Sequence, residues 1–170
     1  MNEMPADITV RRARTADVKA IRGFVDAYAP ARKLLNKPTV TLYEDVQEFW
    51  VAERADGVVG CGALHVMWED LAEIRTLAVA PAMRGKGIGH LLLEHLFTTA
   101  RELGVRRLFC LTFEVEFFAS HGFAEIDGSP VAPDVFEELL RSYDEGIAEF
   151  LDLDRVKPNT LGNTRMIMRL

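Results

Sequence analysis

The chain has 170 residues, of which 49% are apolar and 27% are charged, so we expect one globular domain spanning residues 1–170. Its net charge of −6 argues against general nucleic-acid binding, and no apolar run approaches the roughly 20 residues that a membrane span needs. The N-terminal residues lack the basic and apolar regions of a signal peptide, so a cytoplasmic protein without a membrane partner is expected.

Cys61 and Cys110 both stand in apolar, strand-like runs. Buried, inert thiols are therefore predicted at both positions, in place of a disulfide framework or a zinc site. The four histidines show no spacing typical of metal ligands, and no metal is predicted.

The first elements are a strand and a helix. Residues 8–12 alternate in the manner of a strand, and Thr15 then offers an N-cap oxygen to a helix. The apolar face of that helix carries Val18, Ile21, Val25 and Tyr28. Residues 31–41 are basic and contain a proline, which predicts a loop at the edge of a binding groove, leading to a short helical stretch at residues 42–46.

Three strands are predicted next. Residues 49–53 and 58–68 are strand-like runs separated by Asp56-Gly57, a pair typical of tight hairpins. Residues 71–79 form the third strand. If this strand has no bulge, the period of two places four of its side chains on one face, namely Glu73, Arg75, Leu77 and Val79.

A glycine-rich segment follows the third strand. Residues 84–89, Arg-Gly-Lys-Gly-Ile-Gly, stand in front of an amphipathic helical stripe that ends at Gly104. Glycines let the backbone turn and expose its N–H groups, and the following helix directs its positive end toward the same point. Arg84 and Lys86 add two cations, so the segment predicts a seat for the pyrophosphate of a small molecule.

The remaining elements complete an α/β order. Residues 106–113 have the pattern of a buried strand, so strand, loop, helix and strand form a crossover unit. A short helix at residues 115–120, a helix beginning at Pro133 or Asp134, and a final strand at residues 165–170 follow. These elements predict a parallel or mixed sheet covered by helices.

The glycine-rich loop and its position resemble the GNAT superfamily of N-acetyltransferases, whose signature matches at Arg84, Gly87 and Gly89. The resemblance implies an α/β fold with a mixed central sheet, a splayed strand pair and flanking helices. It also implies that the loop holds the pyrophosphate of acetyl-CoA, through Arg84, Gly85, Lys86, Gly87, Ile88 and Gly89. The backbone of the preceding strand would pair with the pantetheine arm, at Leu77, Ala78 and Val79. A dinucleotide fingerprint and a Walker loop do not match the spacing.

A more specific resemblance is to the acetyltransferase domain of N-acetylglutamate synthases, in their short stand-alone form. It is carried by residues 49–53, 59–64, 72–79, 108–112, 117–123 and 161–166. It implies transfer of an acetyl group from acetyl-CoA to the α-amine of glutamate or glutamine, the step that opens arginine biosynthesis. The sequence shows no amino-acid-kinase domain, which binds arginine in longer synthases, so feedback by that route is not expected.

An α-amine is mostly protonated near neutral pH, so its attack on a thioester requires a base. Glu73 is the candidate, because its strand is expected to face the acetyl group. The alternative is a structural carboxylate that pairs with Arg75 or faces solvent. A backbone N–H group of residues 77–79 can stabilise the oxyanion of the tetrahedral intermediate.

The leaving thiolate needs a proton donor, which is a different group from the base. In many relatives a tyrosine four residues before a Gly-Phe pair protonates it, but Phe118 stands at that position here. In the synthases a hydroxyl residue on the preceding strand has this role, and Thr112 matches its place. Threonine is a weak acid, so we expect a hydrogen bond or a water relay, with an ordinary strand threonine as the alternative.

An amino-acid acceptor needs cations for its carboxylate. The predicted substrate-binding residues are Arg75, Lys33 from the basic segment, and Thr164 with Arg165 in the synthase-like tail. A solvated surface position is the alternative for each cation. Gly162-Asn163 stand where synthases often have paired arginines, so the choice between glutamate and glutamine stays open.

Two rival functions fit the same residues. One is a related enzyme that acetylates another small amine or a protein N-terminus. The other is a CoA-binding sensor without catalysis, which Phe118 in place of the usual tyrosine suggests. Homodimers are common in the superfamily, so a second copy of the chain is a compatible partner, although no residue pattern is diagnostic of one.

Overall fold

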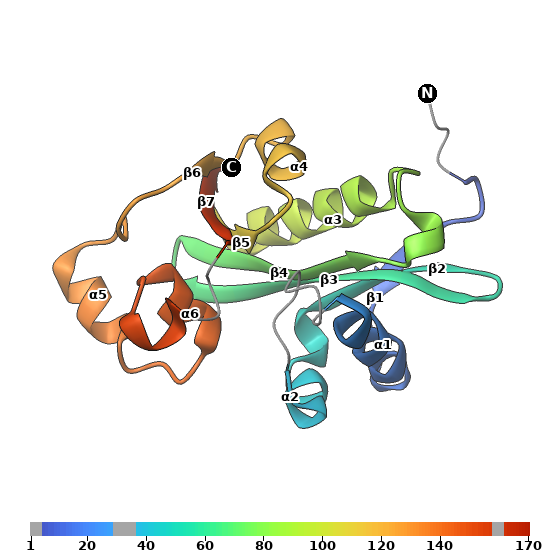
Figure 1. Cartoon of the computed structure of the whole chain (residues 1–170), viewed down its shortest axis with the longest axis horizontal. Helices are drawn as coiled ribbons and strands as arrows, with labels where there is room; N and C mark the ends of the chain where they lie inside the picture. The colour runs from blue at the N-terminus through green and yellow to red at the C-terminus, as the bar shows by residue number, and fades with distance from the viewer. Residues whose placement is uncertain (1–4, 29–36, 158–161) are drawn as a thin grey trace. The chain divides into compact units, whose positions relative to one another are not determined.

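The computed structural model describes residues 5–28, 37–157 and 162–170. Seven strands form one sheet in the order β1-β2-β3-β4-β5-β7-β6 (Figure 1). The chain forms two compact units. The first holds Met1–His65 and Ile74–Leu103, and the second holds Val66–Glu73 and Gly104–Leu170.

The first unit is built on antiparallel strands. β1 (Thr9–Arg12) pairs with β2 (Phe49–Arg54), and β2 pairs with β3 (Gly57–Trp68). The predicted hairpin is confirmed, but its loop is Ala55-Asp56, one residue earlier than Asp56-Gly57. The reason is that Gly57 already pairs with Arg54, at a φ of +135° that favours glycine.

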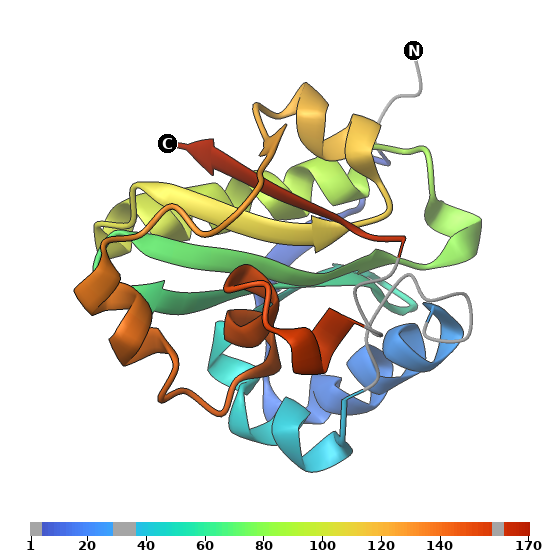
Figure 2. The same ribbon diagram turned by 60° about the vertical axis from the view of Figure 1, so that its left-hand side comes forward.

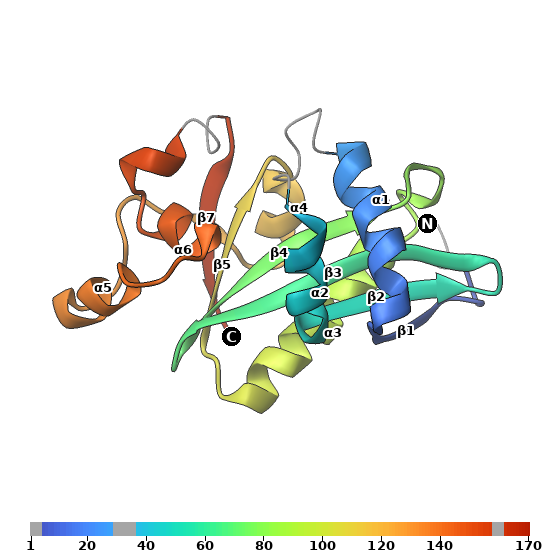
Figure 3. The ribbon, with the colours of Figure 1, turned by 90° about the horizontal axis from the view of Figure 1, so that it is seen from below.

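Helices cover both faces of these strands. α1 (Val18–Tyr28) and α2 (Thr39–Glu44) lie on one face, which Figure 3 views from below. They form a core cluster with the strands, made of Val18, Ile21, Phe24, Leu42, Phe49, Val51, Cys61, Ala63 and Ala78. α3 (Ile88–Leu103) lies on the opposite face, where it contributes to a second cluster of Ala52, Val59, Met83, Ile88 and Leu92 (Figure 1).

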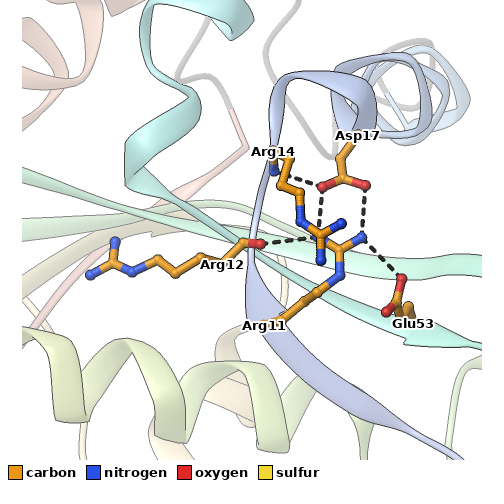
Figure 4. A network of polar contacts seen from close by, with 5 residues as sticks. All are labelled: Arg11, Arg12, Arg14, Asp17 and Glu53. Atoms are coloured by element: carbon orange, nitrogen blue, oxygen red, sulfur yellow. Dashed lines mark hydrogen bonds and ion pairs between the residues drawn. The ribbon is translucent and has the colours of Figure 1, made fainter.

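The predicted N-cap at Thr15 is wrong, because a 3-10 turn over Thr15–Asp17 precedes α1. The Asp17 carboxylate instead accepts the backbone N–H of Arg14 at 2.7 Å. Asp17 also accepts two hydrogen bonds from the Arg11 guanidinium, at 2.8 and 3.0 Å, and Arg11 donates to Glu53 at 2.9 Å (Figure 4). Arg11 thereby holds the pKa of Asp17 below its usual value and ties β1, β2 and the start of α1 together.

Two glycines of β3 let α3 lie close to the sheet. A Cβ at Gly60 would stand 3.1 Å from the carbonyl oxygen of Ala78 and 3.1 Å from the side chain of Leu92. A Cβ at Gly62 would stand 2.9 Å from the side chain of Leu77. The absence of side chains at both positions therefore sets how closely α3 and the end of β4 can approach β3.

The second unit contains the parallel part of the sheet. β4 (Leu71–Val79) begins here and pairs in parallel with β5 (Arg107–Thr112) over Leu71–Glu73. β5 pairs antiparallel with β7 (Thr164–Arg169), which pairs with the short β6 (Ala124–Glu125) (Figure 2). The predicted mixed sheet is confirmed, and parallel pairing between β4 and β5 is what the predicted crossover requires.

The α-helices described in the second unit follow β5. α4 (Val115–Ser120) and α5 (Pro133–Leu139) match the predictions, whereas α6 (Glu145–Phe150) was not predicted. Asp144 caps α6 by accepting the N–H of Ile147 at 3.1 Å. The rings of Phe109 and Phe150 meet edge to face at 5.2 Å, in a core cluster that contains Met67, Leu71, Phe109, Leu139, Ile147, Phe150 and Leu151.

Within residues 5–28, 37–157 and 162–170, further 3-10 turns lie at Val46–Glu48, Pro81–Met83 and Asp154–Val156. Both cysteines are buried free thiols, as predicted, and burial raises the pKa of Cys61 to about 12. Among the described residues, no helix combines the length and the apolar character needed to cross a bilayer.

Candidate acetyl-transfer site

The strand β4 carries most of the predicted site residues, and one of its residues has an unusual backbone conformation. Thr76 has a φ of +55°, a left-handed conformation that breaks the alternation of side chains. Leu77 and Val79 pack on the α3 side, against the cluster of Ile88 and Leu92, while Leu71 belongs to the cluster of Phe109. The prediction that Glu73, Arg75, Leu77 and Val79 share one face assumed regular alternation along the strand, and the left-handed conformation of Thr76 removes that condition.

Glu73 is buried at 4% exposure and lies opposite Phe109 in the register of β4 and β5. By the period of two it shares a face with Leu71, whose side chain is fully buried in the core cluster of the second unit. Burial raises the pKa of the Cys110 thiol well above its usual value, and the charge of Glu73 adds to this effect. Glu73 is therefore a buried carboxylate that shares a strand face with a core leucine and lies near the Cys110 thiol.

Thr112 ends β5, the strand parallel to the start of β4. It is buried at 6% exposure, and its hydroxyl oxygen accepts the backbone N–H of Glu114 at 2.8 Å. This contact fixes the oxygen and leaves the hydroxyl proton available for donation. Phe118 is an aromatic core residue, with ring centroids 5.2 Å from Phe117 and 5.2 Å from Phe123.

The glycine-rich loop has the backbone that an anion seat needs. Gly85 and Gly87 take φ values of +77° and +83°, which residues with a Cβ rarely adopt. The helix α3 starts within this segment, at Ile88, and the first N–H groups of a helix have no carbonyl partner within it. Arg84 is exposed and Lys86 is half-buried beside these groups. The arrangement suits a pyrophosphate.

The donor strand has a contact that sequence reasoning missed. The Tyr28 hydroxyl, at the end of α1, donates a hydrogen bond of 2.5 Å to the carbonyl oxygen of Val79. The next N–H group, that of Ala80, donates to the carbonyl of Val59 in β3 at 2.8 Å. No pattern in the sequence pairs residues 28 and 79, which are 51 positions apart.

Arg75 lies among charged side chains of the first unit. Burial raises the pKa of the Asp45 carboxyl, and Glu48 acts in the same direction, while cations that include Lys37 and Arg75 oppose them. His65 Nδ1 is hydrogen-bonded to the Glu48 carboxylate. Arg75 is thus a half-buried cation within electrostatic range of Asp45, a setting compatible with carboxylate binding.

The tail residues have a structural setting. The Arg165 guanidinium donates to the backbone carbonyls of Glu149 at 3.0 Å and Gly128 at 2.8 Å, and also to that of Phe150. Burial lowers its pKa. Arg165 thus holds the end of α6, and its predicted contact with a substrate stays a prediction, as does that of the half-buried Thr164. Lys33 lies outside the described residues.

Comparisons with known proteins agree with this arrangement. A model of the acetyltransferase (GNAT) domain matches residues 45–125, which include β4, the glycine-rich loop and α3. An amino-acid acetyltransferase of Mycobacterium tuberculosis is 61% identical, with both chains covered completely. The chain belongs to the GNAT acetyltransferase family. The predicted family and fold are therefore confirmed, and acetyl-CoA is the co-substrate that goes with them.

Solved structures of GNAT relatives have the same fold. The Rv2747 protein of Mycobacterium tuberculosis, crystallised in complex with CoA and NLQ, superposes with a TM-score of 0.92 at 62% identity, over 95% of this chain and 99% of that one. The N-acetylglutamate synthase of Neisseria gonorrhoeae, complexed with CoA and N-acetyl-glutamate, has a TM-score of 0.76 at 25% identity. That match covers 97% of this chain but 35% of the synthase.

Proposed function

We propose that this GNAT enzyme is a cytoplasmic amino-acid N-acetyltransferase of the N-acetylglutamate synthase type. It transfers the acetyl group of acetyl-CoA to the α-amine of L-glutamate or L-glutamine, at the first step of arginine biosynthesis. The observation that carries the proposal is the 61% identity, along the whole of both chains, with an amino-acid acetyltransferase. The complex of the gonococcal synthase with CoA and N-acetyl-glutamate supports the acceptor class.

In this proposal the donor binds to the first unit. The pyrophosphate lies on the N–H groups of Gly85 to Gly89, with Arg84 and Lys86 as counter-charges. The pantetheine arm extends along Leu77 to Val79, the segment that follows the left-handed residue Thr76. One N–H group of this segment then stabilises the oxyanion that forms on the acetyl carbonyl.

Glu73 is the proposed general base. The amine loses a proton to this carboxylate as its nitrogen attacks the thioester carbonyl directly, without an acyl-enzyme. The burial of Glu73 on the strand that leads to the donor segment supports this role. Arg75 is the proposed contact for a carboxylate of the acceptor, with Lys33, Thr164 and Arg165 as further candidates.

Collapse of the tetrahedral intermediate expels the CoA thiolate, which takes up a proton. Thr112 is the proposed residue at this step, through a hydrogen bond from its hydroxyl or through a water relay. Its oxygen is already held by the Glu114 N–H, which supports donation of the hydroxyl proton to a partner. Phe118, which is packed among aromatic rings, supplies no proton.

The test is thiol release from acetyl-CoA with a panel of amino acids led by L-glutamate and L-glutamine, with mass detection of the product. Turnover confined to that pair is expected. Glu73→Gln should lower kcat by roughly 10²-fold or more while acetyl-CoA binding persists. Glu149→Gln is the matched control, because Glu149 is also a buried glutamate of the second unit, at 3% exposure. Equal losses in both variants would remove Glu73 from the mechanism.

A different acceptor or a sensor would give a distinct result. If acetyl-CoA binds but no amino acid on the panel is acetylated, the amino-acid assignment fails. Small amines and peptides with free N-termini would then be tried as acceptors. Binding without turnover on any of them would leave the CoA-binding sensor, the reading that Phe118 suggests.

A further inference from the structure

The peptide unit between Val79 and Ala80 has a defined orientation. All described peptide bonds are trans, so the Val79 carbonyl and the Ala80 N–H point in opposite directions. The Ala80 N–H donates to the carbonyl of Val59 in β3. The Val79 carbonyl therefore points away from β3, toward the other edge of β4, and this is where the Tyr28 hydroxyl meets it at 2.5 Å.

That edge of β4 carries the polar groups to which an extended ligand can add. At this edge the Tyr28 hydroxyl holds the carbonyl of Val79. The Thr76 carbonyl, just before the segment Leu77–Val79, is instead held from β3, where the Cys61 thiol donates to it at 3.3 Å. An extended amide-bearing chain binds a strand edge through main-chain hydrogen bonds, which require peptide groups in a set orientation.

We propose that Tyr28 is a positioning residue of the acetyl-CoA site. Its hydroxyl orients the Val79 peptide group at the strand edge, so that the pantetheine arm finds that edge already arranged for hydrogen bonding. The inference rests on the donor site proposed above and adds a residue from α1 to it. The aromatic ring of Tyr28 packs against the core cluster of the first unit, so the hydroxyl can be removed without removing the packing.

The test compares Tyr28→Phe with Tyr43→Phe, a control at an exposed tyrosine of α2 in the same unit. Calorimetric titration of each purified protein with CoA and with ADP measures binding to the whole donor site and to the pyrophosphate seat separately. Thermal unfolding monitors the fold. We expect Tyr28→Phe to weaken CoA binding by roughly 2- to 10-fold, the effect of one net hydrogen bond. ADP binding, kcat at saturation and the amino-acid KM should change less than about 2-fold.

Unchanged or tighter CoA binding in Tyr28→Phe would overturn the proposal. Equal weakening of CoA and ADP would also overturn it, because the defect would then be a general loss of structure. Failure of the proposed function has a separate signature, since it appears in the unaltered enzyme as absence of amino-acid acetylation. The CoA and ADP affinities of the two variants do not depend on the acceptor.

Discussion

Removal of Arg11 should destabilise the protein far more than removal of a surface arginine. In Arg11→Gln the Asp17 carboxylate loses two hydrogen bonds from the guanidinium, and Glu53 loses one. The side chains of Arg11 and Asp17 are 19% and 9% exposed, so water replaces little of what is lost. The Asp17 carboxylate would be left as a buried charge that still accepts the hydrogen bond from the Arg14 N–H.

The magnitude follows from this geometry. Breaking a fully buried ion pair by removing one partner costs about 3–5 kcal/mol. Because Asp17 retains a backbone donor and both side chains keep some contact with water, we expect Arg11→Gln to cost about 2–4 kcal/mol. Arg54→Gln is the matched control, since Arg54 lies on β2 in the same unit and pairs with Asp7 at exposures of 34% and 49%. The control should cost far less, because water replaces most of what an exposed ion pair contributes.

Urea unfolding followed by circular dichroism measures both variants. The free energy of unfolding should fall for Arg11→Gln while the urea dependence stays that of the unaltered protein, because the folded surface is the same. A double-mutant cycle with Glu53→Gln separates the contribution of Glu53 from that of Asp17. If Arg11→Gln costs no more than Arg54→Gln, the network of Figure 4 does not stabilise the fold and the reasoning is refuted.

Three further predictions concern the pH dependence of stability, the close approach at Gly60 and the anchoring of α6 by Arg165. The pKa of Asp17 in the folded protein is lowered, chiefly by its hydrogen bonds from Arg11. The contribution of Asp17 to the free energy of unfolding is therefore complete above its pKa in the unfolded chain, and it is lost as the pH falls through its pKa in the folded protein. Urea titrations between about pH 5 and pH 3 should therefore show a shallower loss in Asp17→Asn than in the unaltered protein, and parallel curves would contradict this. Gly60→Ala should cost about 1–3 kcal/mol, because its Cβ meets the Ala78 carbonyl. Gly23→Ala, which meets nothing within 4 Å, should stabilise by about 0.5–1 kcal/mol, and equal melting temperatures for these two variants would dismiss the close-approach argument. Arg165→Gln should cost about 1–3 kcal/mol through the carbonyls of α6, without rescue by Arg165→Lys, and full stability of either variant would show that α6 is held by other contacts.

Local patterns were enough for the main elements. Residues 71–79 were predicted as a strand with the bounds that the structure has, because a run of apolar residues between turns marks a buried strand. The helix ending before Gly104 was predicted because glycine is common just past a helix end, and Gly104 takes a φ of +88° there. α6 was missed, since six residues span less than two turns and show no clear period.

Features of the candidate site that depend on local backbone conformation could be predicted, whereas features that depend on contacts between distant segments could not. The glycine-rich loop was predicted from its residues alone because its conformation depends on the positive φ values of Gly85 and Gly87. The left-handed conformation of Thr76 was not predicted, because a φ of +55° at a β-branched residue contradicts local preference and must be held by surrounding contacts. The setting of Arg165 among three carbonyls likewise comes from segments that are distant in the chain.

The sequence by itself determined the order of the longer strands and helices, the anion-binding loop with its cations, and the family resemblance that the comparisons confirmed. These properties depend on hydrophobic periodicity and glycine conformation, which are local. Only the tertiary structure decided the burial of Glu73, the fixed hydroxyl of Thr112, and the contact between Tyr28 and the Val79 carbonyl. Such properties arise when chain folding brings distant segments together and removes water from between them, so they depend on residues that no local pattern connects.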